Sequence, residues 1–394
     1  PLYQANLKEE RMDDRNEMHG KSCKQRFIPF AVCVVFSLVA SALLFLMWPS
    51  SRLVFHYRAP IGGSLARCAR DTLARAPTPT SAHRVRPANI DLVAAMGDSI
   101  SLGYKSENED DLVTIFRPGN SFVMGGDGEL ATQLTLPNIL RSLHPRLDGF
   151  STGRDLLRAN TKLNVALPGM LVDGMAMQAG ELIRRLRAYP DYKKKWKLVH
   201  IFIGTNDIRL PCMLSSNSTS PELHKQYLLE SIQMLKTSLP RTIVSIIQLW
   251  NVNFSSRAND IITSQHQCDD IEKSGEEVTK LYRKAVDEIE KLKEFNSDDF
   301  TVVVQHIFDD LLEPPRQESG AYFVDFYARD ILHLSKFGNS LVARQLWKSL
   351  LSPIGSQGKR STPAEMSSLS PELACPNPAC PYIRTVRNSL NCGD

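Results

Sequence analysis

Short apolar runs alternate along this chain with longer segments of helical periodicity. The runs are rich in β-branched residues and span 92–96, 163–167, 198–203, 242–249 and 300–305, with a shorter piece at 322–326. One-sided apolar stripes at helical spacing occupy 172–188, 221–239, 270–295 and 341–351. Because parallel strands need long crossover connections, this alternation predicts an α/β fold, a three-layer sandwich with a mostly parallel central sheet flanked by helices.

Four blocks lie at or just beyond the carboxyl ends of these predicted strands. They are Ala95–Ser101, Asn164–Gly169, Gly204–Asp207 and Asp330–His333. Sheets of this kind place their functional sites at the carboxyl ends of the strands. We therefore expect the four blocks to meet in one site, although each alone would pass for an ordinary turn.

The blocks contain the parts of a nucleophilic site. A serine hydroxyl such as that of Ser99 is a weak nucleophile until a base removes its proton. Of the nine histidines, only His333 has an aspartate three residues before it. At that spacing Asp330 can reach the imidazole Nδ1, which leaves Nε2 to face Ser99. We expect His200, inside a predicted strand, to be a core histidine with a local hydrogen bond.

Attack on an ester carbonyl places negative charge on its oxygen, and fixed donors must stabilise that charge. The candidate oxyanion donors are the backbone amides of Ser99 and Gly169 and the side-chain amide of Asn206. Asp98 and Asp207 stand beside these residues, and we expect them to give structural support by accepting backbone N–H bonds.

The ordered set of blocks resembles the GDSL, or SGNH, hydrolase superfamily, whose four letters match Ser99, Gly169, Asn206 and His333. The segments 79–88, 117–122, 124–128 and 375–378 are similar to its phospholipase B-like branch. The resemblance covers residues 68 to 388. It implies a flavodoxin-like SGNH fold, a Ser–His–Asp acyl-enzyme mechanism that needs no cofactor, and lipid ester substrates. Phe122 replaces a tryptophan of that branch, at a position expected to line the substrate wall.

Three alternatives stay open beside a lipid hydrolase. They are an esterase for short-chain or sugar-borne acyl groups, a membrane-anchored surface protein that has lost turnover, and an adhesion module. Nucleic acid is not an expected partner, because 47 basic residues are nearly balanced by 43 acidic ones. No H-E-x-x-H motif or phosphate loop is present, so we expect no metal site and no nucleotide chemistry.

Residues 27–48 carry no charge and are long enough, as a helix of about 33 Å, to cross a bilayer. Five basic residues lie between 11 and 26, and only Arg52 and Arg58 follow closely, which predicts a single-pass type II protein with its catalytic domain on the lumenal or extracellular side. If the segment is instead a cleaved signal peptide, the protein is secreted.

The expected organisation is a cytoplasmic tail (1–26), a transmembrane signal anchor (27–48), a stalk (49–86), an SGNH hydrolase domain (87–355) and a C-terminal extension (356–394). We expect the extension to pack only through its cysteines. Six cysteines follow the anchor, at 68, 212, 268, 375, 380 and 392, and an even number on an oxidising side suggests disulfides. Sequons at Asn217 and Asn253 suggest glycosylation. The disulfide pairing and the oligomeric state stay open.

Overall fold

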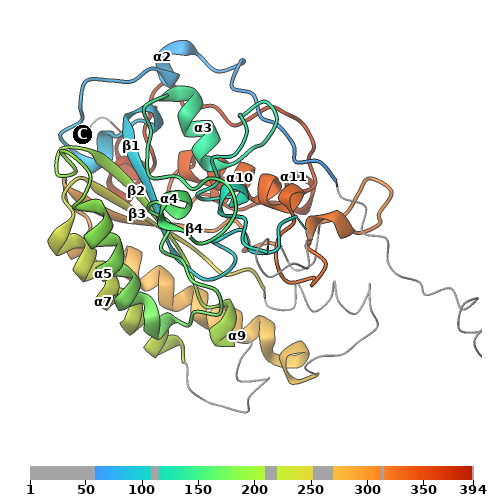
Figure 1. Cartoon of the computed structure of the whole chain (residues 1–394). Helices are drawn as coiled ribbons and strands as arrows, with labels where there is room; N and C mark the ends of the chain where they lie inside the picture. The colour runs from blue at the N-terminus through green and yellow to red at the C-terminus, as the bar shows by residue number, and fades with distance from the viewer. Residues whose placement is uncertain (1–57, 108–114, 209–219, 252–268, 312–314, 393–394) are drawn as a thin grey trace, which may run out of the picture. The chain divides into compact units, whose positions relative to one another are not determined.

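The computed structural model describes residues 58–107, 115–208, 220–251, 269–311 and 315–392 (Figure 1). The predicted tail and anchor, both sequons, Cys212 and Cys268 lie outside these ranges. Within the described ranges, no helix combines the length and the hydropathy that crossing a bilayer would require.

The centre of the fold is a parallel sheet of four strands, β1 (Ile90–Gly97), β2 (Trp196–Phe202), β3 (Thr242–Ile247) and β4 (Phe300–Gln305). Among the described residues the strands are hydrogen-bonded in chain order, β1-β2-β3-β4. All of their residues are buried except Asp91. Strands covered on both faces need such nearly continuous apolar sequences, and the strand predictions at these four places are confirmed.

Helices form a layer on each side of the sheet. The helices α5 (Met175–Leu186), α7 (Pro221–Ser238) and α9 (Asp269–Glu290) pack side by side on one face (Figure 1). Each connects two neighbouring strands, and right-handed crossovers that advance in one direction place their helices on the same face. The other face is covered by α3 (Leu136–Leu143) and α10 (Lys336–Leu351). The result is the expected three-layer α/β sandwich.

Polar residues begin several of these helices. Thr135, Ser220 and Ser335 are the N-caps of α3, α7 and α10, and each accepts a hydrogen bond from a backbone N–H of the first turn. Such caps satisfy donors that have no partner within the helix. The cap of α10 matters for the site, because it fixes where the chain turns after His333.

Shorter helices complete the described fold. They are α2 (Arg70–Leu73), α4 (Arg158–Thr161), α11 (Pro363–Met366), α12 (Val386–Leu390), and the 3-10 turns η1 (Ala82–Arg84), η2 (Pro87–Asn89), η3 (Pro118–Asn120), η4 (Val172–Gly174), η5 (Lys293–Phe295), η6 (Val324–Phe326) and η7 (Gln357–Lys359).

Two strand predictions were wrong. Residues 163–167 follow β1 without forming a strand: Leu163 O accepts from Ala95 N at 3.2 Å and Val165 N donates to Ala95 O at 2.9 Å, with a single bridge at Asn164. The segment leaves the sheet after a third bond, from Leu167 N to Gly97 O at 3.1 Å, because the exposed turn Leu167–Gly169 follows. Residues 322–326 end in η6 and not in a strand.

The two ends of the described chain pack on the domain and on each other. Of the predicted stalk, the part from Arg58 on is described, and it buries Leu65, Ala82 and Val85 against the core. The disulfide Cys68–Cys375 joins this part to the C-terminal extension.

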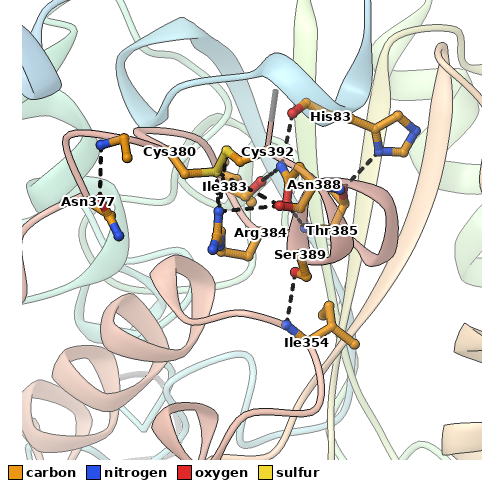
Figure 2. Close-up of a disulfide and its surroundings, with 11 residues drawn as sticks. His83, Ile354, Asn377, Cys380, Ile383, Arg384, Thr385, Asn388, Ser389 and Cys392 are labelled. Carbon is orange, nitrogen blue, oxygen red and sulfur yellow. Dashed lines mark hydrogen bonds between the residues drawn. A yellow bond between two sulfur atoms is a disulfide. The ribbon is translucent and has the colours of Figure 1, made fainter. Parts of the chain in front are cut away.

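The C-terminal extension does not pack only through its cysteines, and that expectation was wrong. Besides the Cys380–Cys392 disulfide, Asn388 donates to His83 O at 2.9 Å, and Thr385 Oγ1 lies 2.8 Å from His83 Nδ1 (Figure 2). Met366 and Ile383 are buried in the hydrophobic core. The extension is therefore an integral part of the domain.

Candidate active site

The structure brings Ser99, His333 and Asp330 into one hydrogen-bonded chain. Ser99 Oγ lies 2.7 Å from His333 Nε2, although the two residues are 234 positions apart. His333 Nδ1 lies 2.7 Å from Asp330 Oδ2. Ser99 stands just beyond β1 and His333 just before α10, and the packing of α10 on the sheet unites them.

The turn from Asp330 to His333 explains why a spacing of three residues works. Asp330 Oδ1 accepts the backbone N–H of His333 at 3.0 Å and of Leu332 at 3.2 Å, so the carboxylate also shapes the loop. Ile331 adopts φ +53°, a left-handed conformation that β-branched residues rarely take. A strain on the order of 1–3 kcal/mol at this point is held by the surrounding hydrogen bonds.

The charge state of Asp330 suits an orienting acid. Burial raises the pKa of this carboxyl, but the hydrogen bonds from His333 and Leu332 and the charge of His333 outweigh it, so the pKa lies well below its usual value. Asp330 is therefore ionised throughout the neutral range.

Two residues beside the Ser99–His333–Asp330 series were not identified from the sequence. The ring of Tyr104 lies 4.7 Å from the imidazole of His333 at an interplanar angle of 55°. Lys105 Nζ lies 3.5 Å from Asp330 Oδ2, the oxygen that also faces His333. Both follow Ser99 by a few residues, and Tyr104 N donates to Ser99 O at 3.1 Å. Only their nearness to Ser99 in the sequence could have drawn attention to them.

The candidate oxyanion donors come from three separate segments, of which that of Asn206 is helical. Gly169 has φ +71°, and a Cβ placed there would meet nothing within 4 Å, so the backbone conformation and not the available space calls for glycine. Asn206 lies beyond β2 and donates one amide N–H to Met170 O at 3.0 Å, which ties it to the loop of Gly169.

Hydrogen bonds from a buried side chain hold the end of β1 at Gly97, two residues before Ser99. Gln178 of α5 accepts from Gly97 N at 2.7 Å and donates to Gly97 O at 2.8 Å, and its side chain is buried. A Cβ at Gly97 would lie 2.2 Å from Phe202 O, so no larger residue fits. Sequence reasoning did not identify Gln178, because its position on α5 predicts only a helix residue.

Asp98 and Asp207 are buried carboxyls behind the site. Asp98 Oδ1 accepts from Ile100 N at 2.9 Å, whereas Asp98 Oδ2 has no hydrogen-bond partner among the described residues. Burial raises the pKa of Asp98 to about 7, and the Asp207 charge adds to that effect. Asp207 accepts from Val172 N, and burial raises the pKa of Asp207 to about 6.

A polar network joins the loop after Ser99 to the start of α10. Glu107 contacts Arg117 Nε at 3.1 Å, Asn120 Nδ2 at 3.1 Å and Lys336 Nζ at 3.4 Å. Lys336 N also donates to Ser106 O at 2.7 Å. Arg117 and Asn120 belong to a segment that the sequence singled out, and the network indicates that they hold the serine and histidine loops together.

Two further expectations needed correction. Phe122 does not line a substrate wall: it is buried in the core, 6.3 Å from the ring of Phe202. His200 is a buried core residue of β2 as expected, but neither ring nitrogen has a hydrogen-bond partner among the described residues. Burial lowers the pKa of His200 to about 3, so it stays neutral.

The fold is a three-layer α/β sandwich, and a serine, a histidine and an aspartate are hydrogen-bonded in series beside its sheet. Serine hydrolases use this arrangement. The family model for GDSL-like Lipase/Acylhydrolase matches residues 93–346. The chain belongs to this family.

The chain is also similar to proteins of known sequence and of known structure. Human and rat proteins named "Phospholipase B1, membrane-associated" are 34% and 31% identical, each over 79% of this chain. The chain spans only 22% of the length of these relatives. The crystal structure of a GDSL-like lipase candidate from Parabacteroides merdae aligns with 72% of this chain and 98% of its own at 15% identity and a TM-score of 0.37.

Proposed function

We propose that this protein cleaves acyl esters of phospholipids and lysophospholipids, with Ser99 as nucleophile, His333 as general base and Asp330 as the acid that orients the imidazole. The observation that carries the proposal is the pair of 2.7 Å contacts, Ser99 Oγ to His333 Nε2 and His333 Nδ1 to Asp330 Oδ2. A nucleophile, a base and an orienting group within hydrogen-bond reach are the requirement for this chemistry.

In the first step Ser99 Oγ bonds to the ester carbonyl carbon while His333 Nε2 takes the hydroxyl proton. The imidazolium then gives that proton to the departing alkoxide, the ester C–O bond breaks, and the acyl group stays on Ser99. In the second step water attacks the acyl carbon while His333 takes its proton, and the bond to Ser99 Oγ breaks. The proton returns to Ser99, and the fatty acid is released. The backbone N–H groups of Ser99 and Gly169 and the amide of Asn206 would stabilise the oxyanion, each worth about 3–4 kcal/mol.

A lipid substrate is supported by the names of the relatives, which are phospholipases described as membrane-associated. The uncharged segment 27–48 fits an N-terminal anchor that would hold the site near a bilayer, with the hydrolase domain on the lumenal or outer side. The disulfides Cys68–Cys375 and Cys380–Cys392 suit such an oxidising compartment. We keep the five-part domain boundaries as part of this proposal, with the described parts of the stalk and of the C-terminal extension packed into the hydrolase domain.

To test the proposal, the purified full chain is incubated with diacyl and with monoacyl phosphatidylcholine, and the released fatty acids are identified. Ser99→Ala should lower the rate by at least about a thousandfold, because it removes covalent catalysis but not binding. Ser142→Ala is the matched control, since among the described residues its hydroxyl bonds only to Ile139 O on α3. Turnover of short-chain esters without turnover of either lipid would refute the lipid substrate. If a fluorophosphonate probe failed to label Ser99, the catalytic assignment would be wrong.

A further inference from the structure

Two adjacent leucines are exposed between Gly153 and Asn160, in a loop that runs into the first residues of α4. Leu156 is 39% exposed and Leu157 is 65% exposed. Arg154 and Arg158 flank them and are exposed as well. Single exposed apolar residues are ordinary on protein surfaces, but a neighbouring pair between two cations is the composition of an interfacial membrane contact.

The loop is held in this form by its own hydrogen bonds. Asp155 Oδ1 accepts from Leu157 N at 2.7 Å and from Asn160 Nδ2 at 3.0 Å. Asp155 itself has φ +84°, outside the regions that side chains with a Cβ prefer. At the base of the loop, Gly153 N donates to Asp127 Oδ1 at 2.8 Å. The backbone therefore presents the two leucines to solvent in a fixed arrangement.

The same loop is linked to His333 through two aromatic residues. Asp155 N donates to Phe116 O at 3.2 Å, and the ring of Phe116 lies 5.4 Å from that of Tyr104. The Tyr104 ring in turn lies 4.7 Å from His333. A surface that receives the leucines would therefore be held beside the reacting serine.

The charges of the loop favour an anionic surface. Neither Arg154 nor Arg158 forms an ion pair within the part of the chain that the structure describes. The acid between them, Asp155, is already engaged by the loop backbone. Basic side chains with no acidic partner are attracted to negatively charged lipid headgroups.

We propose that residues 153–160 form a docking loop for an anionic phospholipid surface. Leu156 and Leu157 enter between the headgroups, while Arg154 and Arg158 contact lipid phosphates. The loop thereby delivers an acyl ester from the lipid surface to Ser99. The delivery step depends on the proposed lipid hydrolase function, whereas the docking step can be measured without any turnover.

The first experiment measures insertion directly in the full chain. In L157W, made together with W48F because Trp48 lies in the proposed anchor, the introduced indole should be quenched at least about twofold more by vesicles of brominated phosphatidylcholine and phosphatidylglycerol than the three remaining native tryptophans are, since Trp196, Trp250 and Trp347 are buried. The matched control is L390W. Leu390 is 86% exposed on α12. The helix α12 contacts His83, which precedes the amino end of β1. Leu390 is therefore at the opposite end of the sheet from the site. Equal quenching of the two variants would overturn the proposal.

The second experiment links docking to catalysis. The double variant L156S/L157S should lose at least about tenfold in rate on mixed phosphatidylcholine and phosphatidylglycerol vesicles, and its rate on monomeric p-nitrophenyl butyrate should stay within about twofold of the wild type. An equal loss on both substrates would mean that the loop supports the fold of the site and not docking. A wild type inactive on both substrates would refute the proposed function, and the quenching result would still decide the docking.

Discussion

The buried carboxyl of Asp98 offers a quantitative test of the electrostatics around the site. Its Oδ2 atom has no hydrogen-bond partner among the described residues, and the side chain is fully buried beside Ser99. Replacing it as Asp98→Asn keeps the shape and the acceptor for Ile100 N, and removes the ability to ionise. We expect the variant to be more stable than the wild type at neutral and alkaline pH.

The magnitude follows from the pKa. Burial raises the pKa of Asp98 from 3.8 to about 7 in the folded protein. When the folded pKa of an acid exceeds the unfolded one, stability is present at low pH and is lost as pH rises from the unfolded to the folded pKa. A difference of about 3 pKa units corresponds to about 4 kcal/mol. The advantage of Asp98→Asn should therefore grow from near zero at pH 4 to about 4 kcal/mol at pH 8.

The assay is urea unfolding of the wild type and the variant at pH 4, 6 and 8 with the disulfides intact. Other titrating groups are common to both proteins, so the difference between the two unfolding free energies reports the titration of Asp98 together with its interaction with Asp207. Asp71→Asn, at an exposed position on α2, should show no such trend. If the difference for Asp98→Asn were the same at every pH, the reasoning from burial would be refuted.

Three other substitutions test the site and the extension. Asp330→Asn should lower kcat by about 10⁴, because His333 Nδ1 would lose its acceptor and the imidazole would lose its orientation. Steady-state kinetics on a soluble ester measure this loss. A loss of tenfold or less would contradict the role of Asp330 as the orienting acid. Asn206→Ala should lower kcat by about 10²–10³ with little change in KM, and a change confined to KM would speak against an oxyanion donor. Asn388→Ala removes buried hydrogen bonds to His83 O and Ile383 O and should cost about 1–3 kcal/mol in thermal unfolding while kcat stays the same; unchanged stability would mean that the extension is dispensable.

Expectations about the ends of the chain depended on composition, and composition was a poor guide there. The extension after Gly355 is rich in serine and proline, yet Ile383 is buried and Ile383 N donates to Val85 O at 2.9 Å. The segment 163–167 has the apolar run of a strand and makes three backbone hydrogen bonds to β1, but it forms a single bridge and turns away after Leu167. In both places contacts from distant parts of the chain outweigh the local pattern.

The sequence by itself determined the alternation of strands and helices, because apolar periodicity depends on neighbouring residues alone. It also determined the candidate triad, since Ser99 and the Asp330–His333 pair stand in recognisable local blocks. Only the tertiary structure decided what surrounds these residues. Three contacts join separate parts of the chain: the ring contact of Tyr104 with His333, the hydrogen bonds of Gln178 with Gly97, and the ion pair of Glu107 with Lys336. Such contacts exist only after the layers have packed.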